Sequence, residues 1–212
     1  MLRTEKILGA GLLLIMAGLA IWGHFNLPDV AMPVHFNASG MADGYQPRDI
    51  ALIVIPGISL VVMALMLWIL PPLMPSIARS ATVYGIVVMS LLALMTATQA
   101  MLVLSQAGVA MDHARLAFSG TGLLFIILGN YMPKMRQNWL MGIRTPWTLA
   151  DERVWDQTHR FAGPLFMLGG AITLAGALFA PIDWRVPILI VAILGVCFVS
   201  YAYSWLASKR LR

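Results

Sequence analysis

Long apolar runs alternate with short polar segments along the chain. Six runs contain no Lys, Arg, Asp or Glu, and each is close to the ~20 residues that cross a bilayer. They cover 7–23, 50–70, 82–104, 116–132, 163–180 and 186–206. Because lipid offers no hydrogen-bond partner to the backbone, each run is predicted to be a transmembrane α-helix.

The composition agrees with this pattern. The chain has 212 residues, of which 60% are hydrophobic and 11% charged, whereas a soluble domain carries about 25% charged residues. We therefore predict an all-α polytopic membrane protein. The first run could instead be a signal peptide, but it is longer than a usual signal core, which favours an uncleaved span.

The positions of Lys and Arg predict the orientation of the spans. If the N-terminus is cytoplasmic, only Arg48, Arg115 and Arg185 fall outside, and all other Lys and Arg residues fall inside. The positive-inside rule then favours an N-in, C-in protein of a cell membrane. The basic charge is spread over the inner loops beside anionic lipid headgroups, so no direct nucleic-acid partner is expected.

Two connections are long, an external loop at 24–49 and a cytoplasmic loop at 133–162. Long loops in a compact protein are usually functional or disordered, and the aromatic and turn-forming residues here favour function. Within one integral membrane domain, 1–212, the loops define a two-span unit, 1–70, and a four-span unit, 82–212.

The external loop contains the stretch PVHFNASGMAD, which begins at Pro33. We expect a short extended segment in which His35 and Asn37 point the same way, with Asp43 following a turn at Gly40. These side chains form either a polar site or a hydrogen-bonded loop. They do not make up a zinc ligand set, so no metal is expected.

The cytoplasmic loop contains NWLMGIRTPWTLADERVWDQTHRFAG, from 138 to 163. Gly142 permits a tight bend, and Pro146 forces Thr145 towards extended geometry. Thr148 is predicted to be a helix N-cap, with Asp151 three residues later.

The residues after Asp151 have the 3.6-residue periodicity of an amphipathic helix. We expect it to lie at the cytoplasmic interface and to end where Gly163-Pro164 begins the fifth span. Its apolar stripe comprises Val154, Trp155, Thr158, Phe161 and Ala162, and its polar face comprises Glu152, Asp156 and His159.

Arg144 lies between a flexible glycine and a rigid Thr-Pro-Trp turn, which would aim its guanidinium in one direction. It could lock the structure by pairing with Asp151 or Asp156 or by capping a helix. It could instead bind a lipid headgroup, a peptide or a protein through its planar fork, and catalysis is a third role.

Glycines predict close helix packing in three spans. They lie in the first span at Gly9, Gly11 and Gly18, in the fourth at Gly122 and Gly129, and in the fifth at Gly169, Gly170 and Gly176.

Both long loops resemble known motifs. The segment GNYMPKMRQNWLMGIRTPWTLADERVWDQTHRFAG resembles the SdpI-like immunity family, and MPVHFNASGMADGY resembles the Pro-x-His-x-Asn domain of unknown function that often precedes it. The matching positions are Pro33, His35, Asn37 and Gly40 outside and, inside, Asn138, Gly142, Arg144, Thr145, Pro146, Trp147, Thr148, Trp155, Thr158 and His159. We call the inner set the cytoplasmic motif.

The resemblance implies an inner-membrane protein that protects its cell from a membrane-active peptide toxin. It also implies a cytoplasmic partner, a repressor held at the membrane, with no catalytic residue and no cofactor. The sequence leaves the oligomeric state open.

Two other functions remain as alternatives. One is a small-molecule or lipid transporter, for which Gln99 and Asn130 are the amides best placed to line a polar path. The other is a membrane enzyme at the cytoplasmic face, although no nucleophile–base motif is recognisable.

Overall fold

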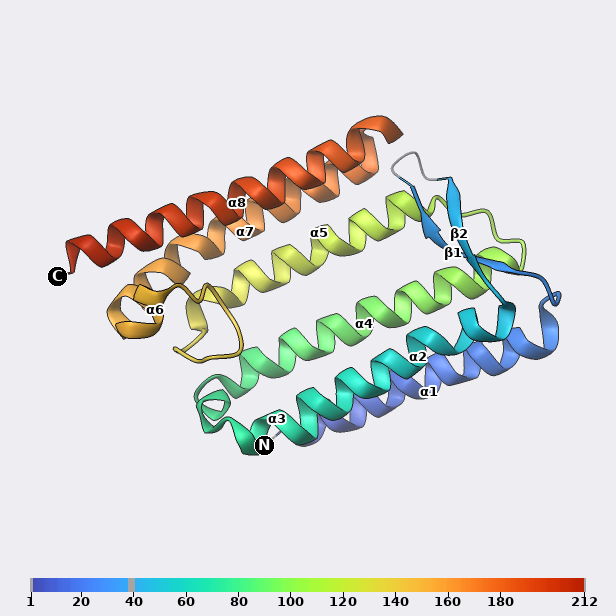
Figure 1. Ribbon diagram of the computed structural model, residues 1–212, viewed down its shortest axis with the longest axis horizontal. Coiled ribbons are helices and arrows are strands. Elements are labelled where there is room, and N and C mark those ends of the chain that lie inside the picture. Colours follow the sequence, from blue (N-terminus) through green and yellow to red (C-terminus); the bar gives the residue numbers. More distant parts are fainter. Residues whose placement is uncertain (1, 38–40, 212) are drawn as a thin grey trace. The chain divides into compact units, whose positions relative to one another are not determined.

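Long α-helices dominate the computed structural model, which describes residues 2–37 and 41–211 (Figure 1). Within this part of the chain, six helices are long and apolar enough to cross a membrane. They coincide with the six predicted runs, so the prediction of an all-α polytopic membrane protein is confirmed. The N-in, C-in orientation stays a prediction.

The helices and strands follow one another along the chain with short connections, apart from the loop between η3 and α6. In order they are α1 (Arg3–Asn26), β1 (Met32–Phe36), β2 (Ala42–Gln46), α2 (Arg48–Ala64), the π-helical turn η1 (Leu65–Ile69), α3 (Leu70–Leu73), the 3₁₀ helix η2 (Pro75–Ser80), α4 (Ala81–Gln106), α5 (His113–Tyr131), the 3₁₀ turn η3 (Met132–Lys134), α6 (Pro146–Ala150), α7 (Glu152–Phe179) and α8 (Ile182–Arg210).

The chain divides into two compact units. We call residues 2–73 and 88–117 the hairpin unit, and residues 74–87 and 118–211 the loop unit. The division runs through α4 and α5, so each of these helices contributes to both units.

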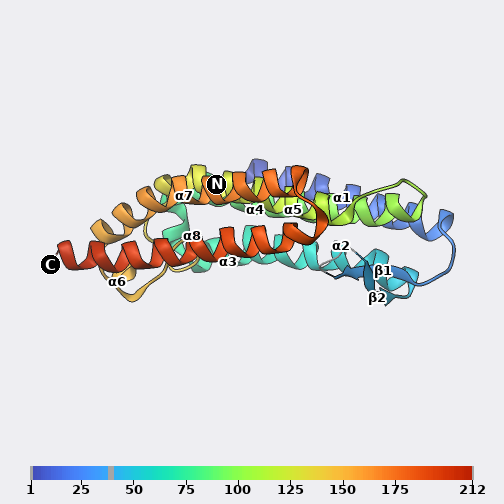
Figure 2. The ribbon, with the colours of Figure 1, turned by 90° about the horizontal axis from the view of Figure 1, so that it is seen from above.

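The hairpin unit is built on α1 and α2, which lie side by side (Figures 1 and 2). Between them β1 and β2 pair as an antiparallel hairpin, which confirms the extended segment expected at Pro33. At the base of the hairpin, Arg48 donates a hydrogen bond to the Leu27 carbonyl at 3.0 Å, and His24 contacts Asp49 at 2.9 Å. These contacts tie the end of α1 to the start of α2.

In the loop unit, α5 and α7 approach each other through glycines at two levels. A Cβ on Gly122 would lie 2.8 Å from the Gly170 carbonyl oxygen, and a Cβ on Gly129 would lie 2.6 Å from the Gly163 oxygen. Two backbones in contact leave no room for a side chain between them. The predicted close packing of the fourth and fifth spans is therefore confirmed.

The glycines of the first span behave differently. A Cβ on Gly9 would meet the Met63 sulfur of α2 at 2.8 Å, whereas Gly11 and Gly18 have no described neighbour within 4 Å of that position. Gly9 therefore packs against a side chain of the second span, and the predicted close packing of the first span through its glycines is wrong among the described residues.

The predicted boundary between the interfacial helix and the fifth span is wrong. One continuous helix, α7, runs from Glu152 to Phe179 and contains Pro164. The segment expected to form a separate amphipathic helix is therefore the first part of α7. By contrast, α5 ends at Tyr131, close to the end of the predicted run 116–132 and two residues before Pro133.

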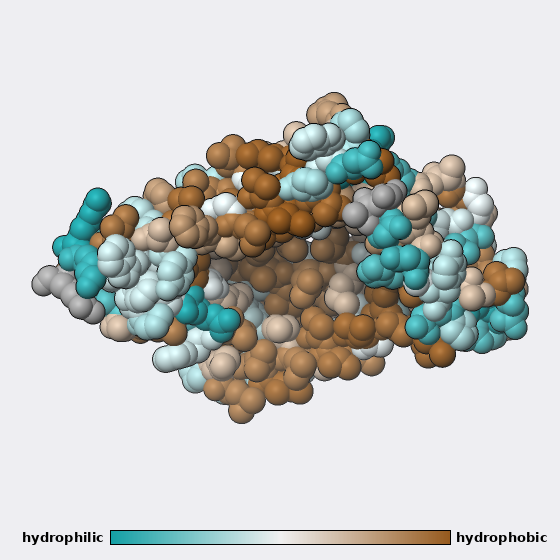
Figure 3. Space-filling view, turned by 45° about the horizontal axis from the view of Figure 1, so that its top comes forward, coloured by the Kyte–Doolittle hydropathy of each residue, from teal (hydrophilic) through white to brown (hydrophobic). Residues whose placement is uncertain are grey.

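Apolar side chains cover the helices over the face shown in Figure 3, and hydrophilic residues gather towards the helix ends. Large side chains such as Leu14, Phe179 and Val191 are mostly exposed. An exposed apolar surface of this extent suits a lipid environment and would be unfavourable in water.

Candidate functional site

Trp155 anchors the cytoplasmic loop to α7. Its side chain is fully buried, in a cluster with Val83 and Met135. Its indole N–H donates a hydrogen bond to the Met135 carbonyl oxygen at 2.7 Å. A buried indole N–H needs such a partner, so this bond fixes the start of the loop against the helix.

His159, one turn after Trp155, holds the middle of the loop. The two rings stack with centroids 4.0 Å apart. The Ile143 N–H donates to His159 Nε2 at 3.0 Å, so Nε2 must be the unprotonated nitrogen. Nδ1 then carries the proton and donates to the Trp155 carbonyl at 2.8 Å. The prediction that His159 lies on an exposed polar face is wrong, because its side chain is buried.

Gly142 makes this contact possible. Its φ is +104°, a conformation that favours glycine. A Cβ at this position would also overlap the Nε2 atom of His159. The predicted bend is therefore confirmed, and no other residue fits it.

Asn138 shapes the first turn of the loop. Its amide donates to the Arg136 carbonyl, and its side-chain oxygen accepts from the backbone N–H groups of Leu140 and Met141. Asparagine favours turns because its side chain can replace a backbone partner in this way. Asn138 is buried, so its role in the structure is to order the loop.

The short helix α6 begins at a different residue from the one predicted. Thr145 is the N-cap, Pro146 is the first helical residue, and Thr148 at the third position completes a capping box. Thr148 also donates to the Ile143 carbonyl at 2.7 Å. Asp151 is the N-cap of α7 instead. The prediction that Thr148 is an N-cap is therefore wrong.

Trp147 connects α6 to α8. Its indole N–H donates to the Ser204 hydroxyl at 2.8 Å, and its ring packs edge-on against Tyr201. Thr158, on α7, is fully buried, and its hydroxyl has no hydrogen-bond partner among the residues described. The cytoplasmic motif is thus brought together around α6 and the first turns of α7.

Arg144 is the exposed residue at the edge of this cluster. Its guanidinium donates to the Trp139 carbonyl at 2.7 Å and forms no ion pair within residues 2–37 and 41–211. The alternative in which Arg144 pairs with Asp151 or Asp156 is not the one formed, because those carboxylates pair with Arg153 and Arg136.

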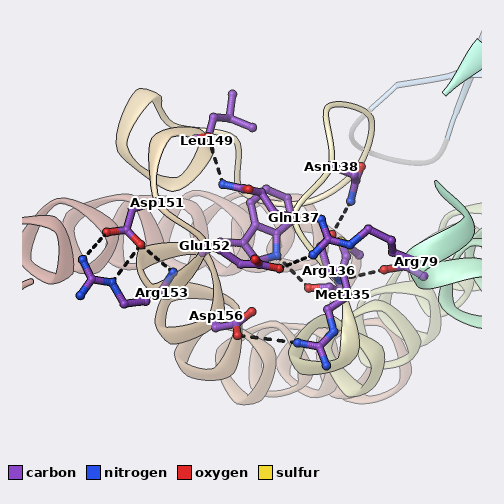
Figure 4. A network of polar contacts seen from close by, with 12 residues as sticks. Arg79, Met135, Arg136, Gln137, Asn138, Leu149, Asp151, Glu152, Arg153 and Asp156 are labelled. Atoms are coloured by element: carbon purple, nitrogen blue, oxygen red, sulfur yellow. Dashed lines mark hydrogen bonds and ion pairs between the residues drawn. The ribbon is translucent and has the colours of Figure 1, made fainter. Parts of the chain in front are cut away.

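Three ion pairs surround the loop (Figure 4). They join Arg79 to Glu152 at 2.5 Å, Arg153 to Asp151 at 2.8 Å, and Arg136 to Asp156 at 3.9 Å. The hydrogen bond from the Arg153 side chain is the main cause that lowers the pKa of the Asp151 carboxyl. All three pairs are at least partly exposed, so they orient the loop more than they stabilise it.

The predicted outer residues fall on the hairpin. His35 Nδ1 and Asp43 Oδ1 are 2.5 Å apart, so the two side chains that could form a polar site bind each other. Asn37 lies just beyond β1, where its side-chain oxygen accepts from the Met41 N–H. Pro33 lies within β1. Gly40 lies outside the described residues.

Sequence reasoning missed His113, the first residue of α5. Its ring stacks on Phe36 of β1 with centroids 4.4 Å apart. The only signal in the sequence is a histidine directly before an apolar run, which is too common to single out.

Comparison with known proteins supports the resemblance seen in the sequence. Residues 134–204 match the SdpI/YfhL protein family, and residues 11–60 match a domain of unknown function, DUF1648. The first segment contains the whole cytoplasmic motif, and the second contains the hairpin. No solved structure matches the chain.

One curated relative is the "Immunity protein SdpI" of Bacillus subtilis (strain 168), 38% identical over 92 residues. The matched segment covers 43% of this chain and 44% of that protein, so the chain spans less than half of its relative. The family resemblance is confirmed, and the chain is a multi-pass protein of the bacterial cell membrane.

Proposed function

We propose that this chain, whose residues 134–204 match the SdpI/YfhL protein family, is a membrane immunity protein. In this role it neutralises a membrane-active peptide toxin. The observation that carries the proposal is the 38% identity to a protein named for immunity. In this role the chain binds a peptide and catalyses no reaction.

The cytoplasmic motif supports a partner-binding role. Its buried residues hold the loop in one conformation, and that order lowers the entropic cost of binding a partner. The exposed side chains at the surface of this loop include Trp139, at 67%, and Arg144 of the motif. An aromatic ring beside an arginine is typical of binding hot spots. We propose that this pair contacts a cytoplasmic regulator.

The state of His159 favours binding over catalysis. Both ring nitrogens are engaged in hydrogen bonds, one to the loop and one to its own helix. A general base needs a free nitrogen within reach of its substrate. His159 can gain one only by releasing Ile143, which would open the loop.

Gln99 has a structural role that weakens the support for a transporter. Its side chain is fully buried, and its amide donates to the Leu52 carbonyl at 3.1 Å. One of the two amides that could line a polar path is thus committed to a backbone group of the neighbouring helix.

Toxin challenge of living cells tests the proposal. The chain is expressed in a Bacillus subtilis strain that lacks Immunity protein SdpI, and the strain is exposed to sporulation-delaying-protein toxin. We expect survival at toxin concentrations at least tenfold above those tolerated with an empty vector. Normal membrane accumulation without any gain in survival would refute the proposal for this toxin.

A further inference from the structure

The hairpin unit contains a pocket beside β1 whose wall includes one matching position of the outer loop, Pro33. Its volume is about 490 Å³, within the range of small-ligand sites. Its walls come from β1, the last residue of β2, α2, α4 and the start of α5. They are mostly apolar and include Val34, Phe36, Val54, Met101, Leu102 and His113. We call it the hairpin pocket.

The strand beside the pocket has one edge that no described strand covers. The described sheet has two strands, so β1 pairs with β2 along one edge and with no described strand along the other. An open edge presents backbone N–H and C=O groups that an extended peptide can bind. Val34 and Phe36 of the same strand also line the pocket.

His113 adds an unsatisfied polar group to the pocket wall. Its Nε2 atom is buried and has no hydrogen-bond partner within the described part of the chain. Buried polar atoms are normally hydrogen-bonded, so an unpaired one is unfavourable. Stacking on Phe36 holds the ring in place. An amide group that reached Nε2 from the pocket would supply the missing partner.

We propose that the hairpin pocket receives an apolar segment of the peptide toxin, in extended form along β1. This inference rests on the proposed immunity function and names the site of recognition. A peptide is the occupant because it offers backbone groups for the strand edge, apolar side chains for the pocket and an amide for His113. A lipid acyl chain could fill the apolar pocket, but it offers no backbone groups for the strand edge and no amide for His113.

Filling the pocket tests the inference. Val54→Trp places a bulky ring in the pocket from α2. Val61→Trp is the matched control, because Val61 lies two turns further along α2, is 57% exposed and does not line the pocket. We expect Val54→Trp to accumulate normally and to lower the tolerated toxin concentration at least tenfold, and Val61→Trp to leave it unchanged. Full protection by Val54→Trp would overturn the inference.

Crosslinking gives a readout that does not depend on survival. A photoreactive p-benzoylphenylalanine at Val34 should attach to toxin in membranes, and added Val54→Trp should abolish the adduct. If Val54→Trp fails to accumulate, the presence or absence of a toxin adduct at position 34 still tests whether the pocket binds the toxin. A phospholipid adduct in place of a peptide adduct, or protection without any adduct, would overturn the pocket assignment. An adduct without protection would refute the immunity function and leave the pocket assignment standing.

Discussion

Gln99 replaces a hydrogen-bond donor that α2 lacks. Pro56, inside α2, has no N–H, so the Leu52 carbonyl four residues earlier has no helical partner. The side-chain amide of Gln99, on α4, donates to that oxygen at 3.1 Å. A proline in one span and a glutamine in another therefore form one structural feature.

Gln99→Leu is predicted to destabilise the protein. The substitution leaves the Leu52 carbonyl unpaired in an apolar surrounding, which costs about 1–3 kcal/mol. The substitution also removes Gln99 Oε1, a buried atom without a described partner, and the loss of this unfavourable group offsets part of the cost. We therefore expect a destabilisation near the low end of the range. Thermal unfolding in detergent should show a lower midpoint.

Pro56→Ala provides the control for this prediction. An alanine restores the N–H four residues after Leu52, so Gln99→Leu should cost little in the Pro56→Ala background. Equal losses in both backgrounds would show that Gln99 acts through some contact other than Leu52.

Alanine at the helix contact between α5 and α7 is predicted to lower stability. In Gly129→Ala the added methyl would meet the Gly163 carbonyl at 2.6 Å, so the helices must separate. Overpacking of this kind costs about 1–3 kcal/mol. Gly195→Ala is the control, because nothing described lies within 4 Å of that position. Yield and unfolding temperature should fall for the first variant alone.

Arg144→Lys is predicted to insert and accumulate normally yet to lose most of its protective or partner-holding activity. A planar two-point contact to a carboxylate or phosphate cannot be reproduced by lysine. Loss of such a contact costs about 2–5 kcal/mol when it is buried with a partner. Survival under toxin challenge measures protection, and co-purification measures partner binding.

Arg136→Lys is the control for this substitution, because Arg136 already pairs with Asp156 and should tolerate the change. Full activity of Arg144→Lys would make Arg144 an ordinary positive-inside anchor. If Arg144→Lys fails to accumulate, Arg144 is required for the fold. His35 and Asn37 of the outer loop would then be the next candidates for the functional residues.

Cysteine labelling should map the buried face of α7. Cysteines at positions 152 and 156 should react with a membrane-impermeant reagent on inverted vesicles, because Glu152 and Asp156 are partly exposed. Cysteines at 155 and 159 should be protected, since Trp155 and His159 are buried. Uniform labelling would show that the loop does not cover this face.

Reporter fusions should show the orientation of the spans. A reporter after Arg212 is predicted to lie in the cytoplasm, and one near Asn37 outside, because of the distribution of Lys and Arg. Phosphatase and fluorescent-protein fusions distinguish the two sides. The reverse result at both positions would overturn the N-in, C-in orientation.

The spans could be predicted because each depends only on local composition. Capping was harder to predict, because Thr145 and Thr148 are both good N-cap residues. The deciding signal was Pro146, since proline favours the first helical position and therefore marks the residue before it as the cap.

The burial of His159 could not be predicted from periodicity. Glu152, Asp156 and His159 share one spacing on α7, which correctly places the first two at the surface. The loop that contains Ile143 folds back over the third. A contact between residues 16 positions apart depends on the path of the loop, and helical spacing does not determine that path.

The bond between Trp147 and Ser204 has a consequence for biosynthesis. The two residues are 57 positions apart, and Ser204 lies near the end of the last span. Because a ribosome delivers the chain from its N-terminus, the cytoplasmic motif is synthesised long before Ser204, the hydrogen-bond acceptor of the Trp147 indole. The loop therefore reaches its final form only after α8 has been made, so completion of the last helix and maturation of the motif coincide in time.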